Sequence, residues 1–194
     1  MAKEPTTPSQ TIGPFFHPAL DRAGWSDLTS AGARGDRIAV EGRVLDGDGQ
    51  PCDDALIEMW QANAAGKYAH PDDPQPEDRL DAGFLGFGRA LTAGDGRYRF
   101  KTIRPGRVPG PGGVLQAPHI NLAIFARGLL GRLCTRLYFA DERSNGDDPV
   151  LASIADPVAR RTLLAIPQPA GGEGIVYRFD IVLQGQGETA FFDV

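Results

Sequence analysis

An alternation of polar and apolar side chains with a period of two is the feature that most constrains how this chain can fold. In the segment 97–103, Tyr98 and Phe100 alternate with arginine and lysine residues, so the two aromatic rings project from one face of an extended strand. Glycine-rich turns such as 94–96 separate segments of this kind, and the 25 glycines and 16 prolines of the chain disfavour long helices. The pattern predicts an all-β fold.

Several other short segments have the composition of strands, and some connections between them are long. Besides 97–103, the expected strands are 37–45, 55–61, 119–126, 134–140 and 175–184. The loops 64–90 and 104–117 exceed the usual connection length, and long loops commonly carry functional residues. Short strands joined in this way are typical of a β-sandwich.

A short helix is expected between the fifth strand and the last. Asp156 precedes Pro157, an arrangement typical of a helix N-cap followed by proline in the first turn. Val158, Leu163 and Leu164 would then face the sheet. The sandwich is therefore expected to carry one or two short helices.

The first part of the chain has no clear periodicity and is expected to form an N-terminal arm over residues 1–36. It contains an unusual apolar cluster at 12–16. Such a cluster is expected to be buried against another surface rather than left in solvent. We therefore expect two parts, an arm (1–36) that docks on a partner chain and a single β-sandwich domain (37–194).

Charge and hydropathy exclude some classes of partner. The net charge of −5 disfavours nucleic acid, because phosphate binding requires a basic surface. Apolar runs such as 122–126 are far shorter than the ~20 residues that span a bilayer, and residues 1–8 lack the apolar stretch of a signal peptide. A cytoplasmic protein is expected, bound to neither membrane nor nucleic acid. Cys52 and Cys134 are expected to be reduced packing residues, although the sequence leaves their redox state open.

One strand carries an incomplete metal-binding pattern. His119 and Asn121 are two residues apart and would project from the same face. Two histidines in this arrangement would form a metal clamp, but an asparagine amide is a weak neutral donor that cannot replace imidazole at a transition metal. With part of the clamp missing, His119 is expected to be a hydrogen-bonded core residue.

Three segments, 60–68, 86–106 and 117–121, have an order and spacing that resemble the intradiol ring-cleavage dioxygenases. The resemblance covers about residues 9–194 and implies the β-sandwich of that family, whose catalytic chains hold a non-haem ferric ion with two tyrosinates and two histidines. Carried over residue by residue, these ligands fall on Tyr68, Val108, His119 and Asn121. Two of these four positions carry no suitable ligand, which implies that the chain binds no metal.

Within that family the sequence resembles the iron-free α chain of two-chain enzymes, whose β chain holds Fe(III). The resemblance implies an αβ heterodimer that assembles into a larger oligomer, with the number of units left open. It places Gly13 and Pro14 in the wall of the substrate pocket and Arg127 at the substrate carboxylate. Arg132 and Arg136 remain alternatives for the carboxylate contact, because a guanidinium at any of these positions could donate two parallel hydrogen bonds.

The implied reaction joins O2 to 3,4-dihydroxybenzoate and opens its ring to 3-carboxy-cis,cis-muconate. No catalytic residue is expected in this chain alone, and its exact aromatic substrate is left open. The sequence leaves two alternatives open. One is a self-sufficient intradiol dioxygenase of another catechol, with His17 or His70 as a displaced ligand. The other is a β-sandwich binding module without enzymatic activity, since fold alone does not determine function.

Overall fold

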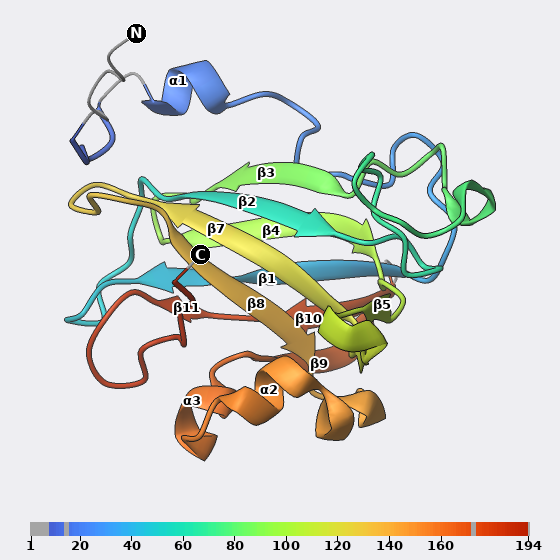
Figure 1. Ribbon diagram of the computed structural model, residues 1–194. Helices are drawn as coiled ribbons and strands as arrows, with labels where there is room; N and C mark the ends of the chain where they lie inside the picture. The colour runs from blue at the N-terminus through green and yellow to red at the C-terminus, as the bar shows by residue number, and fades with distance from the viewer. Residues whose placement is uncertain (1–7, 14–15, 172–173, 194) are drawn as a thin grey trace, which may run out of the picture.

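The computed structural model describes residues 8–13, 16–171 and 174–193 (Figure 1). Nine strands of these residues form one hydrogen-bonded sheet in the order β11-β1-β10-β9-β8-β7-β2-β3, with β4 paired to β1. Their bounds are β1 (Arg37–Leu45), β2 (Leu56–Gln61), β3 (Phe87–Leu91), β4 (Arg97–Ile103), β7 (His119–Phe125), β8 (Leu133–Phe139), β9 (Leu164–Gly171), β10 (Gly174–Arg178) and β11 (Ile181–Val182). A small hairpin, β5 (Val108–Pro109) and β6 (Leu115–Gln116), lies apart from this sheet. The expected all-β fold of the intradiol dioxygenase type is confirmed.

The core lies between two halves of this sheet, which β9 joins by pairing with both β10 and β8. One half contributes Val40 and Phe100, and the other contributes Ile57 and Ile124, all fully buried in the same cluster. Strand β4 has the alternation that its sequence predicts, because its even-numbered side chains are buried and its odd-numbered ones are exposed up to residue 102. Burial of the apolar set on the inner face fixes the register of each strand.

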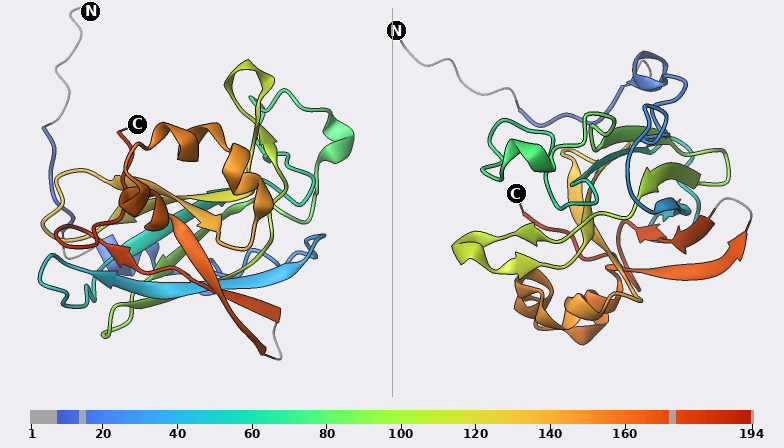
Figure 2. Two further views of the ribbon diagram at one scale, coloured as in Figure 1. Left: turned by 90° about the horizontal axis from the view of Figure 1, so that it is seen from below. Right: turned by 90° about the vertical axis from the view of Figure 1, so that its right-hand side faces the viewer.

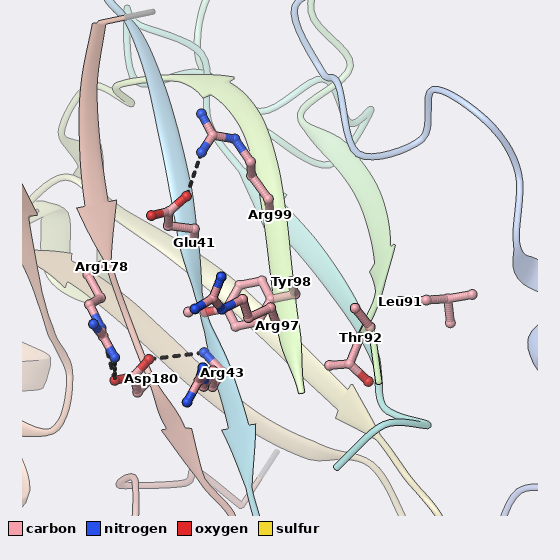
Figure 3. Close-up of a pocket in the computed structure, with 11 residues that line it drawn as sticks. Glu41, Arg43, Leu91, Thr92, Arg97, Tyr98, Arg99, Arg178 and Asp180 are labelled. Carbon is pink, nitrogen blue, oxygen red and sulfur yellow. Dashed lines mark hydrogen bonds and ion pairs between the residues drawn. The ribbon is translucent and has the colours of Figure 1, made fainter. Parts of the chain in front are cut away.

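The arginines on the outer face of β1, β4 and β10 form ion pairs with neighbouring carboxylates (Figure 3). Arg99 pairs with Glu41 across the β1–β4 ladder, and Arg178 pairs with Asp180. Arg97 pairs with Asp95 in the turn before its strand. These three arginines are therefore engaged in ion pairs on the outer face of the sheet.

The predicted last strand, 175–184, is broken into β10 and β11 at residues 179–180. The Arg43 backbone N–H donates to the Asp180 side chain over 3.0 Å, so a carboxylate replaces a backbone carbonyl in the ladder at this point. The expected helix is confirmed as α3 (Pro157–Arg161), whose N-cap is Asp156. Of the three residues expected to face the sheet here, Leu163 is buried. The expectation is wrong for Val158, which is 54% exposed, and Leu164 lies outside the helix as the first residue of β9.

Short helices cover two sides of the sheet. Helices α2 (Pro149–Ser153) and α3 lie below β8 and β9 in the view of Figure 1, and α1 (Phe16–Leu20) lies above β3. Single 3₁₀ turns occur at η1 (Glu77–Arg79), η2 (Pro111–Gly113) and η3 (Arg143–Asp147). None of the helices in the described ranges could span a membrane. Cys52 and Cys134 are both free thiols.

Two loops project side by side from one side of the sheet (Figure 2). One is the long connection between β2 and β3, which carries η1, and the other is the β5–β6 hairpin. Gly66, in the first of these loops, has a φ of 78°. A Cβ at this position would lie 2.0 Å from the carbonyl oxygen of Arg107, which precedes β5. Only glycine permits this close approach, which brings Tyr68 and Val108 to the same side of the molecule.

Candidate functional site

The Tyr68 side chain lies against the last residues of β2 and the beginning of β7. Its ring stacks on Trp60, with centroids 5.5 Å apart and planes 19° apart. Asn121, the cross-strand neighbour of Trp60, donates from Nδ2 to the Trp60 carbonyl and to the Tyr68 hydroxyl, each over 3.3 Å. Burial raises the pKa of Tyr68, so its hydroxyl remains protonated at neutral pH. Two of the predicted ligand positions, Tyr68 and Asn121, are therefore hydrogen-bonded to each other.

His119 is the buried core histidine that the sequence predicts. The residue is only 3% exposed, and its Nδ1 donates to the Ala117 carbonyl over 2.8 Å. Burial, together with the Arg136 charge, lowers its pKa to about 4. At neutral pH the imidazole is therefore uncharged, with the Nδ1 proton held by the backbone.

Val108 completes the four predicted ligand positions, Tyr68, Val108, His119 and Asn121, which we call the vestigial positions. It is 4% exposed in β5, where it pairs with Gln116. It opens with Tyr68 onto a pocket of about 880 Å³, which we call the Tyr68 pocket. The residues that line this pocket are Trp60, Tyr68, His70, Asp72, Asp73, Pro74, Gln75, Val108, Pro109 and Arg132. The structure thus brings Tyr68, Val108 and Asn121 together, with His119 two residues from Asn121 on the same strand.

Arg136 lies beside the vestigial positions as the cross-strand neighbour of Asn121. Its guanidinium donates to the Gln116 side chain over 2.6 Å and contacts the Tyr138 hydroxyl at 3.4 Å. Tyr138 in turn donates to the buried Asp148 carboxylate over 3.2 Å. The sequence identifies Arg136 only as an alternative contact for the substrate carboxylate. Its role here depends on the register of β7 against β8, which no sequence motif specifies.

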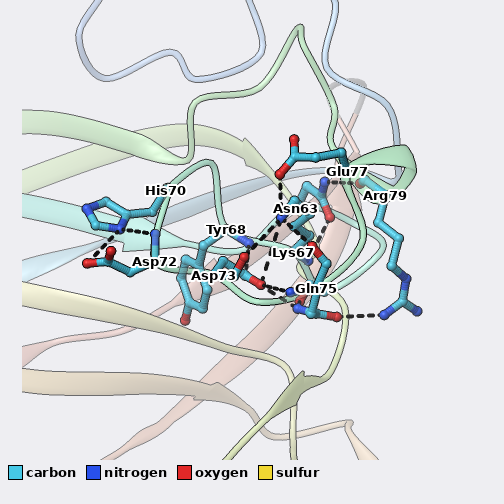
Figure 4. Close-up of polar contacts among 10 residues, drawn as sticks. Asn63, Lys67, Tyr68, His70, Asp72, Asp73, Gln75, Glu77 and Arg79 are labelled. Carbon is cyan, nitrogen blue, oxygen red and sulfur yellow. Dashed lines mark hydrogen bonds and ion pairs between the residues drawn. The ribbon is translucent and has the colours of Figure 1, made fainter.

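A buried lysine holds the loop that carries Tyr68 (Figure 4). Lys67 is 1% exposed, and its ammonium donates to the Gln75 carbonyl over 2.8 Å. It also lies 3.9 Å from Asp73 and 3.4 Å from Glu77. Asp73 accepts from the Tyr68 backbone N–H over 2.8 Å, so the charge at Lys67 is coupled to the position of the tyrosine.

His70, a displaced ligand in the self-sufficient alternative, lies on the same loop. Its side chain is 52% exposed and lies 3.7 Å from the Asp72 carboxylate. Its ring contacts Trp60 edge-on, with centroids 6.5 Å apart. The side chain of His17 lies outside the described residues.

Arg127, which is predicted to bind the substrate carboxylate, follows the last residue of β7 by two positions. Arg127 is 74% exposed on its side chain and forms ion pairs with Asp53 and Asp54. The next residue, Gly128, donates its N–H to the Thr11 hydroxyl over 2.9 Å. Gly13 is exposed, and Pro14 lies outside the described residues. The arm and the Arg127 loop are therefore in contact, whereas the vestigial positions lie at the start of the strand.

The arm also contacts the sheet through an aromatic pair. The rings of Phe16 and Phe125 have centroids 5.8 Å apart, and Ile12 is half-buried. Part of the predicted apolar cluster is thus packed against the chain's own β7. Phe15 lies outside the described residues.

A family model described as Dioxygenase matches residues 13–185. The chain belongs to the intradiol ring-cleavage dioxygenase family. It is 42% identical to the protocatechuate 3,4-dioxygenase alpha chain of Pseudomonas putida, covering 97% of this chain and 96% of that one. It is 35% identical to the protocatechuate 3,4-dioxygenase beta chain of Burkholderia cepacia, covering 95% of this chain and 78% of that one. The dioxygenase domain of a carbohydrate-binding fusion protein from Streptomyces sp. SirexAA-E superposes with a TM-score of 0.62. The two are 30% identical, and the match covers 95% of this chain and 99% of that domain.

Intradiol dioxygenases use non-haem iron, and the vestigial positions of this family member do not fit a ferric ion. Val108 offers no donor atom, and the Asn121 amide nitrogen is engaged by Trp60 and Tyr68. The Arg136 guanidinium adds a positive charge nearby that opposes a trivalent cation. Fe(III) is a hard ion that requires anionic oxygen donors, and none of these groups supplies one.

Proposed function

We propose that the chain is the iron-free α subunit of a protocatechuate 3,4-dioxygenase, which completes the active site of an iron-bearing β subunit. The observation that carries the proposal is the Asn121–Tyr68 hydrogen bond at a site where Val108 replaces the other tyrosine. A family member with this donor set depends on another chain for iron. The two alpha-chain relatives, at 42% and 39% identity, support the same assignment over the beta chain at 35%.

The proposed assembly is an αβ heterodimer repeated in a larger oligomer, with Fe(III) held by the β subunit. Both alpha and beta chains are found among the relatives, which is the composition this assembly requires. The arm (1–36) would dock on the β subunit, and residues 37–194 would form the sandwich domain. The contact between Thr11 and Gly128 supports a position for the arm beside the Arg127 loop.

The bound iron of the β subunit would supply the activation of the catechol for reaction with O2. Cleavage between the two hydroxyl-bearing carbons of 3,4-dihydroxybenzoate places both oxygen atoms of O2 in 3-carboxy-cis,cis-muconate. This chain would contribute the pocket wall at Gly13 and Pro14 and a guanidinium at Arg127. To bind the substrate carboxylate, Arg127 would exchange its exposed pairs with Asp53 and Asp54 for a bidentate contact.

The test is to express the chain with and without an iron-bearing β partner. Alone, the chain should show no ferric-tyrosinate colour and no ring cleavage. Together, the two chains should co-purify, bind iron and cleave 3,4-dihydroxybenzoate. One iron per isolated chain with ring cleavage, or elution as a monomer even when the partner is present, would contradict the proposal.

A further inference from the structure

The Tyr68 pocket retains the features of a ligand site although its surroundings do not fit iron. Its volume of about 880 Å³ lies within the range of small-molecule pockets. Trp60 and Tyr68 supply stacked aromatic surface, and Pro74, Val108 and Pro109 supply further apolar wall. These walls suit a flat apolar ring.

Arg132 is a cation in the lining of this pocket. Arg132 forms no hydrogen bond or ion pair with any residue in the described part of the chain. The pocket on the outer face of β1 and β4 differs, because its arginines Arg99 and Arg178 are already paired with Glu41 and Asp180. An unpaired guanidinium over an apolar pocket is suited to a carboxylate, which it binds through two parallel hydrogen bonds.

The Tyr68 hydroxyl provides a second polar group. Within the described ranges it accepts from Asn121 but donates to no residue, so its proton is available to a ligand. Because a tyrosine hydroxyl is both donor and acceptor, a polar ring substituent that accepts a hydrogen bond can complete its bonding.

The carboxylates in the lining do not oppose an anion strongly. Asp73 accepts from the backbone N–H groups of Tyr68 and Gln75 and lies beside Lys67. Asp72 has a side chain 90% exposed and lies beside His70. The charge of Asp73 is therefore compensated by the N–H groups and the lysine of the loop, and the charge of Asp72 is largely screened by solvent.

We propose that the Tyr68 pocket binds a small aromatic carboxylate without a metal ion, with Arg132 pairing the carboxylate and the Tyr68 hydroxyl donating to a polar ring substituent. The inference goes beyond the proposed function, because it requires neither iron nor ring cleavage. It gives the pocket a binding role in the assembled protein in place of the lost metal chemistry.

The test uses the full-length chain after treatment with a chelator. A Trp25→Phe background leaves Trp60 as the only tryptophan, so that its fluorescence reports the pocket. The probes are 4-hydroxybenzoate, benzoate, which lacks the hydroxyl, and 4-hydroxybenzyl alcohol, which lacks the carboxylate. We expect saturable quenching by 4-hydroxybenzoate, a one-to-one stoichiometry in calorimetry, and binding of the alcohol weaker by about tenfold or more.

Three variants assign the contacts. Arg132→Gln should weaken 4-hydroxybenzoate about tenfold and leave 4-hydroxybenzyl alcohol unchanged. Tyr68→Phe should weaken 4-hydroxybenzoate about threefold to tenfold and leave benzoate unchanged. The control, Arg161→Gln, changes an exposed arginine of α3 that does not line the pocket, and it should bind all probes as the parent does.

Circular dichroism melts identify any variant that fails to fold, and Arg132→Gln, at an exposed position, remains informative if Tyr68→Phe does not fold. The proposal is overturned if 4-hydroxybenzoate produces no saturable change at Trp60, or if Arg132→Gln binds it as tightly as the parent. Either result leaves ring cleavage by the co-expressed chains unaffected, so it is distinct from a failure of the proposed function.

Discussion

Asn121 donates a hydrogen bond from its side-chain nitrogen to the Tyr68 hydroxyl over 3.3 Å. The two residues occupy predicted ligand positions, and in this chain they stabilise each other instead of a metal. Since burial raises the pKa of Tyr68, the phenol carries no negative charge at neutral pH. The hydrogen bond therefore orders two of the positions whose residues do not fit a ferric ion.

Restoring the ligand set should restore metal binding only in part. Val108→Tyr with Asn121→His supplies the two missing donors, but Arg136 would still place a positive charge beside the ion. We expect the double variant to bind Fe(III) at least about tenfold more weakly than the triple variant that also carries Arg136→Gln. Ferric-tyrosinate absorbance and metal analysis measure this difference. Equal affinity of the two variants would show that Arg136 does not oppose the ion.

The low pKa of His119 predicts a pH-dependent stability. The pKa is about 4 in the folded chain, against an ordinary value of 6.5, so the unfolded state binds more protons between these limits. The stability from this residue is complete above about pH 6.5 and is lost as the pH falls toward 4. We expect it to contribute a loss of about 2 kcal/mol between pH 7.5 and pH 5. Urea unfolding at both pH values measures the change.

The matched variant is His119→Gln, which keeps an amide donor for the Ala117 carbonyl but does not titrate. Its unfolding free energy should change much less between the two pH values. Measurements stay at or above pH 5, because the stabilising contributions of Asp27, Asp73 and Glu142, whose pKa values are lowered, are lost at lower pH. If both proteins lose the same stability, His119 is not the responsible group.

Lys67→Met should destabilise the fold and loosen the loop that carries Tyr68. The substitution removes the donor to the Gln75 carbonyl and leaves Asp73 without its cation. Because Lys67 is 1% exposed, we expect a loss of about 2–3 kcal/mol in unfolding free energy. Glu77 adds little to this figure, since its side chain is 82% exposed.

Denaturant unfolding checks the energy, and amide hydrogen exchange of residues 67–79 checks the loop. Arg161→Met, at an exposed position of α3, serves as the control and should change stability by no more than about 0.5 kcal/mol. Unchanged amide hydrogen exchange in the Lys67 variant would show that Lys67 does not order the loop that carries Tyr68.

Arg127→Gln should lower the activity of the co-expressed complex toward substrates that carry a carboxylate. We expect kcat/KM for 3,4-dihydroxybenzoate to fall about tenfold to a hundredfold. Activity toward catechol, which lacks the carboxylate, should fall much less. A drop of this kind in Arg136→Gln instead would reassign the contact, whereas an unchanged ratio in every arginine variant would exclude a carboxylate contact from this chain.

The strands could be predicted where one face is buried and the other is exposed to solvent. Strand 97–103 is found at the predicted residues, because its alternation reflects burial directly. Strands β3 and β9 were not predicted. Strand β9 contains two prolines and an exposed Ile166, so neither its composition nor its period is that of an ordinary strand.

The candidate site could be predicted as a set of positions but not as a network. The motif order located Tyr68, Val108, His119 and Asn121, and the substitutions at two of them indicated the loss of iron. The pairing of Asn121 with Tyr68 depends on how a loop returns to a strand over 53 positions of sequence. Interactions of this range are set by tertiary packing, which local patterns do not encode.

The pairing of β1 with β10 and β11 determines when this protein can fold. Val40 is registered with Tyr177, and Val44 with Ile181, so the first long strand pairs with two strands from the last part of the sequence. Loop-closure entropy must be overcome before these contacts stabilise the sheet. A ribosome must therefore release nearly the whole sheet before β1 acquires its parallel neighbours β10 and β11, and any assembly that requires the complete sheet follows that step.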